Sequence, residues 1–464
     1  MGMINKVYDH SPIFFQNILA SASGYVKNRR MYNKIYYKHR KFLADFDAWN
    51  LERKLSYQNE ELVKFIKFAV TKSKFYRNLY KDIDLTTITT ISDLKKLPVV
   101  DKDMIRKNID DIVTMPKKKA SIRRTGGTTG KSLVVYKCKV DMIKRLAMLD
   151  HFKARVGFEM RKMRCATFTA QHLIPANQTK KVFWRYNKAH RRMMYSSFHL
   201  TEENMRYYIN SLNSFKPQAI DGLLYMTDIA KYIEKHDIKL SFKPMAIFPT
   251  GETLTTPTRA LLERVFGCKV YNQYASSEGA PFITDCPKQN LHIELSTGVF
   301  EFFEEDSNEI LVTSFTTHGT PLIRYRIGDS IETLKTNKQC DCGIKGPIIK
   351  EILGRNDDFL YTAEGAKIRS SSVANLVKDI PNAIIKLQAV QDKVDEIRLL
   401  LEIDENLYQV EYDDILKKVF VNRFGKKTNI LIEHVKHISK EKSGKFRLVK
   451  NNVVNTIIEN KPEE

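Results

Sequence analysis

Strand-like and helix-like segments alternate along the middle of the chain, and this alternation constrains the fold more than any other feature. Short apolar runs typical of buried strands lie at residues 133–136, 219–220, 245–248 and 269–271. Stretches with apolar side chains at helical spacing lie between them, at residues 142–152, 226–236 and 257–266. Strands that alternate with helices in this way pair in parallel and are covered by the helices. The pattern therefore predicts an α/β layered domain with a largely parallel sheet.

The regions on either side of this alternation have other patterns. Residues 57–80 carry apolar side chains at helical spacing, and residues 292–335 form short alternating strands. A compositional break at residues 354–358 precedes two strand-like runs, a helix and a further strand, at residues 383–390, 396–403, 411–424 and 429–432. We predict a large N-terminal α/β domain, a β-rich part within it and a small C-terminal α+β domain, at residues 1–355, about 285–350 and 356–464.

The composition is that of a soluble globular protein. Apolar residues make up 42% of the 464 residues and charged residues 28%, which is an ordinary balance. No apolar run reaches the roughly 20 residues that a membrane-spanning helix needs. Six cysteines are too few for a disulfide framework in a chain of this length. We therefore expect a cytoplasmic protein.

The net charge of +23 attracts polyanions such as nucleotides, anionic lipids and nucleic acids. The sequence contains no zinc-finger, helix-turn-helix or RRM signature, so we expect no nucleic-acid partner. A basic cluster near the start alternates with aromatic residues; its members are Lys27, Arg29, Arg30, Lys34, Lys38, Arg40 and Lys41. This cluster could contact an anionic membrane peripherally or be an ordinary solvated helix face. Nothing in the sequence indicates an oligomeric state.

A glycine- and threonine-rich loop is the first motif with a chemical implication. It consists of Thr125, Gly126, Gly127, Thr128, Thr129, Gly130, Lys131 and Ser132, directly before a strand-like run. Backbone N–H groups and hydroxyls in such a loop can bind phosphate oxygens, and the lysine adds a charge. A Walker loop is excluded, because its opening glycine would be residue 125, which is threonine. A plain turn between strands is the alternative.

Two further motifs follow predicted strands. Residues 271–279 read Tyr-Asn-Gln-Tyr-Ala-Ser-Ser-Glu-Gly, and their hydroxyls and carboxylate suit phosphate oxygens and Mg²⁺. A capped helix start would explain the same residues. Residues 322–329 end in Asp329, which could accept hydrogen bonds from both hydroxyls of a ribose or from the backbone of a local turn.

The last two motifs lie near and beyond the predicted domain boundary. Arg355 and Asp357 belong to the break at residues 354–358, where they suit a nucleotide contact and a hinge. Lys445 lies in the segment Ser443-Gly444-Lys445-Phe446-Arg447, where the glycine gives the lysine freedom to move.

Taken in this order and spacing, the five motifs resemble those of the adenylate-forming superfamily of acyl-CoA synthetases, adenylation domains and luciferases. Within it, the chain resembles the phenylacetate–coenzyme A ligase family, in the branch associated with capsular polysaccharide biosynthesis. The segments that resemble this branch lie at residues 93–98, 183–187, 321–325 and 444–447, in addition to the aromatic and basic N-terminal region. The resemblance covers nearly the whole chain.

The resemblance implies an enzyme that uses ATP and Mg²⁺ to convert a carboxylic acid into its acyl-AMP. It implies that residues 125–131 bind the β- and γ-phosphates, and that Gly251, Glu252 and Tyr274 line the adenine pocket. Ser277 would contact the α-phosphate and Ser276 would belong to the same ATP site. Glu278 would hold Mg²⁺, and Asp329 and Arg355 would bind the ribose. Lys445 would be the catalytic lysine of a mobile C-terminal domain that rotates about Asp357.

The resemblance leaves the acid and the acyl acceptor open. Residues 274–278 read Tyr-Ala-Ser-Ser-Glu, whereas the family has Gly after Tyr and Thr before Glu. Residues 221–225 read Asp-Gly-Leu-Leu-Tyr, whereas the branch has Gly-Tyr-Pro-Ser near the expected acyl pocket. The acceptor is expected to be a thiol such as coenzyme A; an amine of an amino sugar or amino acid is the alternative. A non-catalytic scaffold or binding relative is the third hypothesis.

Three cysteines and a histidine form a candidate zinc site. Cys286 and His292 are separated by five residues, and Cys340 and Cys342 follow across the predicted short strands. Three thiols and an imidazole are a common ligand set for structural zinc. The Cys-x-Cys spacing is tighter than the usual one, and free buried thiols beside an unrelated histidine are the alternative.

Overall fold

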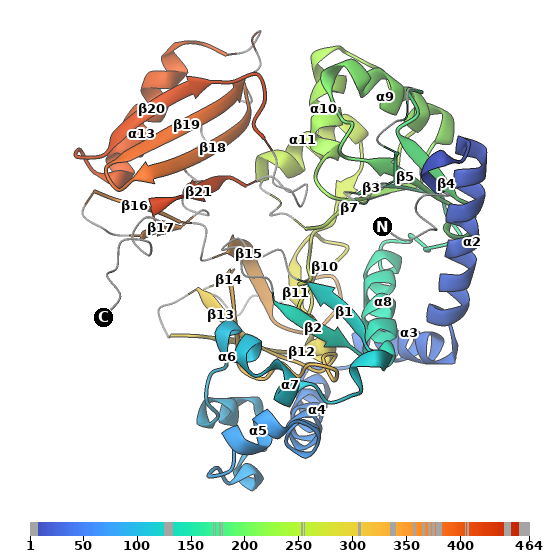
Figure 1. Cartoon of the computed structure of the whole chain (residues 1–464), viewed down its shortest axis with the longest axis vertical. Helices are drawn as coiled ribbons and strands as arrows, with labels where there is room; N and C mark the ends of the chain where they lie inside the picture. The colour runs from blue at the N-terminus through green and yellow to red at the C-terminus, as the bar shows by residue number, and fades with distance from the viewer. Residues whose placement is uncertain are drawn as a thin grey trace. The chain divides into compact units, whose positions relative to one another are not determined.

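The computed structural model describes most of the chain: residues 8–124, 133–169, 171, 173–175, 178, 180–251, 254, 256–304, 308–334, 340–355, 359–363, 367–369, 373, 376, 383–403, 405, 408–439 and 447–453. The chain divides into two compact units, whose elements are labelled in Figure 1. The first unit comprises Met1–Gly251, Leu262–Ile327 and Ile331–Ile352, and the second comprises Glu252–Leu261, Gly328–Ser330 and Leu353–Glu464.

A six-stranded sheet of the order β4-β5-β3-β6-β7-β8 forms one layer of the first unit. Its strands are β3 (Cys165–Thr169), β4 (Trp184–Asn187), β5 (Arg192–Ser196), β6 (Ala219–Gly222), β7 (Ala246–Pro249) and β8 (Lys269–Val270). All neighbours pair in parallel except β4, which lies antiparallel at the edge. β6 and β7 are buried along their whole length, as parallel strands covered on both faces are. The predicted α/β architecture is confirmed.

The helices that alternate with these strands are α8 (Lys139–Ala154), α9 (Met205–Phe215), α10 (Met226–Lys235) and α11 (Thr256–Phe266). Three of them lie where the helical spacing predicts helices, because their apolar residues recur every three or four positions. α8 is longer than predicted at its start, since Cys138 caps it: the Cys138 sulfur accepts a hydrogen bond from the Asp141 N–H at 3.4 Å.

A seven-stranded sheet of the order β12-β13-β14-β15-β11-β10-β9 is the β-rich part of the chain. Its strands are β9 (Gln273–Tyr274), β10 (Ile283–Asp285), β11 (Leu291–Ile293), β12 (Gly298–Phe302), β13 (Glu309–Ser314), β14 (Tyr325–Thr333) and β15 (Ile348–Arg355). A separate hairpin pairs β1 (Ser121–Arg124) with β2 (Val134–Lys137). β2 is the strand predicted after the glycine- and threonine-rich loop, which itself lies outside the described residues.

Helices α4 (Leu51–Lys72), α5 (Lys74–Leu79), α6 (Lys102–Lys107) and α7 (Ile109–Ile112) precede this hairpin. Leu62, Phe65, Ile66 and Ala69 of α4 form one core with Ile310 and other residues of the seven-stranded sheet. The apolar spacing over residues 57–80 belongs to two helices, because Ser73 ends α4 and caps α5. The Ser73 hydroxyl accepts from the Tyr76 N–H at 3.4 Å.

Two more helices, α2 (Ile13–Met31) and α3 (Lys34–Asp47), lie at the start of the chain. Figure 1 shows α2 beside β4, at the edge of the six-stranded sheet. α3 packs against α8, where the Tyr36 hydroxyl donates to the buried Asp150 carboxylate at 2.8 Å. None of the helices that the structure describes is both long and apolar enough to cross a membrane.

The second unit contains a four-stranded sheet of the order β20-β19-β18-β21. Its strands are β18 (Ile384–Lys393), β19 (Glu396–Ile403), β20 (Asn429–His434) and β21 (Val449–Asn451), with a small hairpin of β16 (Phe359–Tyr361) and β17 (Lys367–Arg369). Helix α13 (Glu411–Phe424) buries Leu416, Phe420 and Phe424 in one core with the sheet. The predicted small α+β fold is confirmed.

Candidate functional site

The segment at residues 271–279 passes from one sheet of the first unit to the other. It leaves the six-stranded sheet after β8 and enters the seven-stranded sheet at β9, which pairs antiparallel with β10. Asn272 fixes the crossing, because its N–H donates to the Asp285 carboxylate at 2.7 Å and its carbonyl accepts from the Asp285 N–H at 2.9 Å. The crossing places the serine and glutamate residues of the motif directly after β9.

Ser276, Ser277 and Glu278 form a tight turn. The Ser276 hydroxyl oxygen accepts hydrogen bonds from the N–H groups of Gly279 and Ala280, at 3.1 and 2.9 Å. The Ser277 hydroxyl donates to the buried Glu278 carboxylate at 3.1 Å. The capped helix start considered as the alternative is wrong, because the turn continues into strand β10. The turn holds a hydroxyl and a buried carboxylate side by side.

Arg145 of α8 anchors the end of this turn. One terminal nitrogen of its guanidinium donates to the carbonyls of Gly279 and Ala280, at 2.9 and 2.8 Å, and to the Thr316 hydroxyl at 3.0 Å. The guanidinium also lies 4.2 Å from the ring centre of Phe282. Burial lowers the pKa of Arg145 to about 10, while the Asp141 carboxylate raises it. Arg145 therefore stays charged at neutral pH and sets the path of the backbone after Glu278.

Gly279 permits the turn to approach a neighbouring strand connection. Its φ of +116° lies in the region that favours glycine, and a Cβ at this position would lie 2.7 Å from Thr317 Cγ2. Any side chain here would strain the backbone and push against Thr317.

Lys137, at the end of β2, adds a cation near Glu278. Burial, followed by repulsion from Arg145 and Arg123, lowers the pKa of Lys137 to about 8, and the Glu278 carboxylate opposes the shift. No sequence motif indicates Lys137 or Arg145, because neither differs in pattern from the many lysines and arginines scattered along the chain.

Tyr274 and the segment before Gly251 come together through Gln273. The Gln273 side chain donates to the carbonyl of Pro249 at 3.4 Å, and its Oε1 is buried without a partner among the described residues. Tyr274 is buried, with its ring centre 6.1 Å from that of Phe300. Gly251 follows β7 with a φ of +84°. Two of the three predicted adenine-pocket residues thus lie on neighbouring segments; the third, Glu252, lies outside the described residues.

Asp329 and Arg355 lie on adjacent strands of the seven-stranded sheet, β14 and β15. Asp329 is half-buried and follows Gly328, whose φ of +80° bends the strand. The phosphate loop at residues 125–131, the hinge residue Asp357 and the catalytic lysine Lys445 lie outside the described residues. Their predicted roles stay predictions.

Asp221, where the sequence departs from the capsule branch, is part of a buried ion-pair network on β6. Its carboxylate accepts from Lys153 Nζ at 2.6 Å, from the Thr167 hydroxyl, and from Arg192 at 3.4 Å. Although burial raises it, Lys153 and Arg192 hold the pKa of Asp221 well below its ordinary value. The Asp221 carboxylate is therefore charged and bound to three side chains of the same sheet and of α8.

The candidate zinc ligands converge at one end of the seven-stranded sheet. One ligand atom from each of Cys286, His292, Cys340 and Cys342 can be chosen so that all four lie within 4.8 Å of one another. Cys286 directly follows β10 and His292 lies on β11, while the other two cysteines precede β15. Because His292 pairs with Ile348 of β15, the two halves of the ligand set meet. The described structure supports the grouping predicted from the sequence.

The chemistry of this cluster suits a bound cation. The sulfurs of Cys286 and Cys340 lie 3.6 Å apart, and the Cys342 sulfur lies 3.5 Å from His292 Nε2. Burial lowers the pKa of His292 to about 4, so that the imidazole is neutral, as a metal ligand must be. The Cys340 and Cys342 sulfurs accept hydrogen bonds from the Asn290 side chain and the Ile344 N–H, at 3.2 and 3.4 Å. The residues therefore fit a tetrahedral Cys₃His zinc site.

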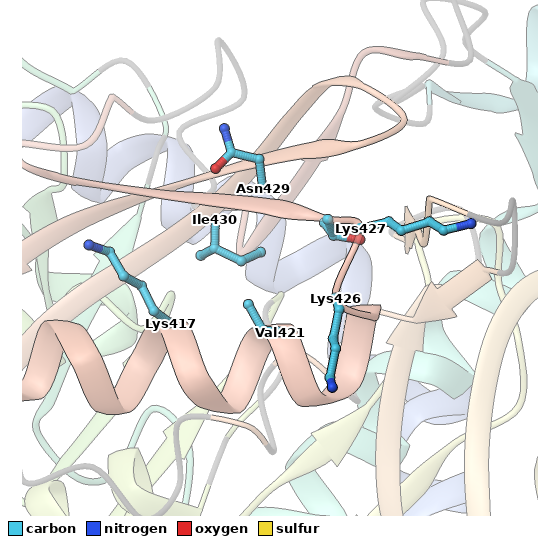
Figure 2. Close-up of a pocket in the computed structure, with 7 residues that line it drawn as sticks. Lys417, Val421, Lys426, Lys427, Asn429 and Ile430 are labelled. Carbon is cyan, nitrogen blue, oxygen red and sulfur yellow. The ribbon is translucent and has the colours of Figure 1, made fainter.

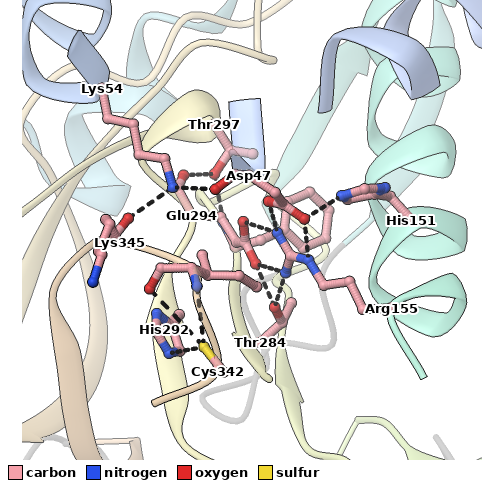
Figure 3. A network of polar contacts seen from close by, with 12 residues as sticks. Asp47, Lys54, His151, Arg155, Thr284, His292, Glu294, Thr297, Cys342 and Lys345 are labelled. Carbon is pink, nitrogen blue, oxygen red and sulfur yellow. Dashed lines mark hydrogen bonds and ion pairs between the residues drawn. The ribbon is translucent and has the colours of Figure 1, made fainter. Parts of the chain in front are cut away.

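A buried charge network borders this cluster and is shown in Figure 3. Arg155, which follows α8, donates to Asp47 of α3 at 2.9 and 2.6 Å, to Glu294 at 3.1 Å and to Thr284 at 3.1 Å. Lys54 of α4 donates to the carbonyls of Asp47 and Lys345, at 3.2 and 2.8 Å. Thr284 and Glu294 are each two residues from a candidate zinc ligand. The network therefore links α3, α4 and the end of α8 to both halves of the cluster.

The second unit has a surface hollow of about 360 Å³ between α13 and β20, lined by Lys417, Val421, Lys426, Lys427, Thr428, Asn429 and Ile430. Figure 2 shows that the three lysine side chains point in different directions. They do not converge as the cations of an anion site would, so this hollow offers no catalytic arrangement.

Comparison with known proteins defines the family. Residues 360–452 match the family model described as the CapK C-terminal domain. The chain is 39% identical to Protein CapK of Staphylococcus aureus over 459 residues, which covers 97% of this chain and 100% of that protein. The chain belongs to the CapK family. The resemblance to the capsule-related branch of the adenylate-forming ligases is thereby confirmed.

Two more distant proteins resemble this CapK-family chain. Indoleacetate–lysine synthetase of Pseudomonas savastanoi is 22% identical over 358 residues, covering 75% of this chain and 84% of that protein. The crystal structure of 2-hydroxyisobutyryl-CoA ligase in the postadenylation state superposes with a TM-score of 0.69 at 15% identity, covering 89% of this chain and 93% of that one. The second likeness shows that the chain has the acyl-CoA ligase-like fold.

Proposed function

We propose that the protein uses ATP and Mg²⁺ in the cytoplasm to activate a carboxylic acid as its acyl-AMP, and then transfers the acyl group to a thiol such as coenzyme A during surface polysaccharide biosynthesis. The turn that sets the Ser277 hydroxyl against the buried Glu278 carboxylate, held by Arg145 in a CapK-family chain, is the observation that carries the proposal. A buried carboxylate with an adjacent hydroxyl suits the oxygen coordination that Mg²⁺ prefers.

In the first reaction, a carboxylate oxygen of the acid forms a bond to the α-phosphorus of ATP, and pyrophosphate leaves. Two anions must meet, so catalysis rests on positioning and on charge neutralisation. Glu278 would hold Mg²⁺, which would neutralise phosphate charge, and Ser276 and Ser277 would donate hydrogen bonds to the α-phosphate. Tyr274 would stack on the adenine, in a pocket that Gly251 and Glu252 would also line.

The remaining residues would complete the nucleotide site from other segments. Residues 125–131 would bind the β- and γ-phosphates, and Asp329 and Arg355 would accept from and donate to the ribose. Lys445 would stabilise the charge that develops on the reacting oxygens. Rotation of residues 356–464 about Asp357 would then withdraw Lys445 and admit the acceptor, as conformational gating.

In the second reaction, the thiolate of the acceptor attacks the acyl carbonyl, and AMP leaves with the bonding electrons. An amine of an amino sugar or amino acid is the second candidate acceptor, and the likeness to indoleacetate–lysine synthetase favours it. Both acceptors use the same acyl-AMP, so the first reaction does not distinguish them.

AMP release separates the two acceptors. Purified protein is incubated with ATP, Mg²⁺ and an acid that supports pyrophosphate exchange, and with coenzyme A or a panel of amino sugars and amino acids. We expect AMP to rise with coenzyme A. AMP that rises only with an amine overturns the thiol proposal, whereas pyrophosphate exchange with none of the acids tested would support a non-catalytic relative. Lys445→Ala should abolish acyl-AMP formation in the same assay; an unchanged rate refutes its assigned role.

We also propose that Cys286, His292, Cys340 and Cys342 hold a structural zinc ion, since a closed set of four protein ligands leaves no position for a substrate. Elemental analysis of purified protein should find about one equivalent of zinc. Less than about a tenth of an equivalent, after purification without chelators, contradicts a resident ion.

A further inference from the structure

Helix α2 contacts the rest of the first unit through polar side chains. Asn17 Oδ1 accepts from the Tyr186 N–H at 2.9 Å, and the Ser21 hydroxyl oxygen accepts from the Lys188 N–H at 3.0 Å. Asn28 donates to the carbonyl of Ala189 at 3.1 Å. These partners lie on β4, the edge strand of the six-stranded sheet, and on the 3₁₀ turn after it (Lys188–His190). Polar residues of α2 thus satisfy the backbone of an exposed sheet edge.

A glycine in the middle of α2 brings the helix close to β4. Gly24 is buried, and a Cβ at this position would lie 2.5 Å from Asn187 Oδ1. The polar face and the glycine together fix which side of the helix faces the protein.

The opposite face of α2 carries large apolar side chains. Phe14, Tyr25 and Val26 are 76%, 56% and 55% exposed, and Phe15 and Ile18 are each 44% exposed. Seven of the seventeen exposed large apolar side chains found among the described residues lie between residues 14 and 37. A helix on the surface of a soluble protein ordinarily turns its apolar stripe inward. α2 does the reverse, which marks its outer face as an interaction surface.

Basic side chains adjoin this apolar face. Residues 10–44 contain seven lysines and arginines and no aspartate or glutamate. Arg29 and Arg30 are exposed in the last turn of α2, and Lys34 and Lys38 are exposed on the first turns of α3. Exposed Ile35 and Tyr37 lie among these cations. Apolar side chains followed by a dense positive charge are the combination that binds the interface of an anionic bilayer.

We propose that α2 and the start of α3 form a docking surface for a lipid bilayer that contains anionic phospholipids. The helix would lie in the plane of the headgroups, with Phe14, Ile18 and Tyr25 inserted and Arg29, Arg30, Lys34 and Lys38 on the phosphates. Charge favours this occupant over a second copy, because two chains of net charge +23 repel each other. The docking surface is independent of the proposed reaction, and each can fail without the other.

Vesicle co-sedimentation of the full-length protein tests the proposal. We expect binding to vesicles of phosphatidylcholine with phosphatidylglycerol, weak binding to phosphatidylcholine alone, and a decrease in binding as NaCl is raised. Replacing two cations by Arg29→Gln and Arg30→Gln should weaken binding about 30-fold. Phe14→Ser with Ile18→Ser should weaken binding at least about tenfold. Lowering the salt should strengthen vesicle binding of the apolar variant, which keeps all its cations, more than that of the charge variant.

Matched controls come from the same unit. Lys67→Gln with Lys72→Gln removes two exposed cations from α4, and Val63→Ser with Phe198→Ser removes two exposed apolar side chains. Both control proteins should bind vesicles like the parent. Circular dichroism and the thermal transition confirm that each variant is folded.

Three outcomes overturn the proposal: equal binding to neutral and anionic vesicles, equal losses in the α4 controls and the α2 variants, or no binding by the parent protein. Sedimentation velocity tests the alternative that a second copy of the chain occupies this face. A dimer of the parent that Phe14→Ser with Ile18→Ser dissociates would assign the face to a second copy instead.

Discussion

Arg155 is the central cation of the network in Figure 3, and its replacement by methionine should destabilise the first unit severely. Its guanidinium and the Glu294 carboxylate are each only 6% exposed, and Asp47 is 19% exposed. Arg155→Met keeps apolar volume but removes the guanidinium that lies between the Asp47 and Glu294 carboxylates. Removing one partner of a buried ion pair costs about 3–5 kcal/mol. We expect the free energy of unfolding to fall by about 4 kcal/mol at pH 7.5.

The decrease in the free energy of unfolding caused by Arg155→Met should become smaller as the pH falls. Although burial raises it, hydrogen bonds from His151 and Arg155 hold the pKa of Asp47 below its ordinary value. A depressed carboxyl pKa contributes stability above the unfolded pKa, and this contribution disappears as the pH falls through the folded pKa. Without Arg155, burial, which raises the pKa of Asp47, is opposed less, so protonation of Asp47 relieves the variant. The difference between parent and variant should therefore shrink between pH 7.5 and pH 5.

Trp49 supplies a local probe for this measurement. Its ring centre lies 5.1 Å from that of Phe46, next to Asp47, and the chain has two tryptophans. In a Trp184→Phe background, urea unfolding followed by fluorescence reports on the helices that Arg155 ties together. Arg264→Met is the matched control, because the Arg264–Glu234 pair is 49% and 42% exposed and should contribute less than about 1 kcal/mol. Equal losses in the two variants, or an Arg155→Met loss that does not change with pH, would refute the reasoning.

The other predictions concern the Glu278 turn and the cysteine cluster. Burial lowers the pKa of Lys137 to about 8, so the free energy of unfolding should rise with pH between about 8 and the unfolded pKa near 10.4. Lys137→Met should be about 2 kcal/mol more stable at pH 7 and should lose this pH dependence in urea titrations. An unchanged pH dependence in the variant would contradict the lowered pKa. Gly279→Ala should cost about 1–2 kcal/mol from its positive φ and slow pyrophosphate exchange by more than about tenfold. Thr317→Ser should not rescue it, because the φ strain remains; full rescue would mean that the Thr317 contact alone matters. Cys340→Ser should lose the zinc measured by elemental analysis and lower the melting temperature, whereas Cys268→Ser should change neither; equal zinc in both refutes the ligand assignment.

The spacing of apolar residues along the chain was sufficient to predict most of the helices and strands. The helix at residues 411–424 is found with those bounds, because Leu416, Phe420 and Phe424 recur at helical spacing on its buried face. The break between α4 and α5 was missed, since Ser73 ends one helix through a side-chain cap that leaves the apolar spacing unchanged.

The site residues that are close in sequence could be predicted, whereas those that act through distant contacts could not. Cys340 and Cys342 are close in sequence, and Cys286 and His292 lie on either side of the turn of one hairpin, so the sequence indicated a cluster. Arg145 and Arg155 act through contacts more than a hundred residues away, to Gly279 and Asp47, and nothing in their own neighbourhoods distinguishes them.

Helix α2 shows the limit of pattern analysis most clearly. Its apolar residues would ordinarily be assigned to the inner face, but the asparagines and serine meet the open edge of β4 instead. The choice depends on the hydrogen-bonding groups of a strand and its following turn, 169 and 167 residues away in sequence. The hydrogen bonds between α2 and the edge strand β4 therefore decide which face of the helix is exposed to solvent.

Acid-dependent exchange of labelled pyrophosphate into ATP tests the central claim most directly. The parent protein should catalyse exchange with at least one acid of a broad carboxylic acid panel. Glu278→Gln should reduce that exchange by about 10²–10³-fold, while Glu60→Gln, on the exposed face of α4, should leave it unchanged. Full exchange by Glu278→Gln would contradict the assigned site, and the absence of exchange with every acid would contradict acyl-AMP formation itself.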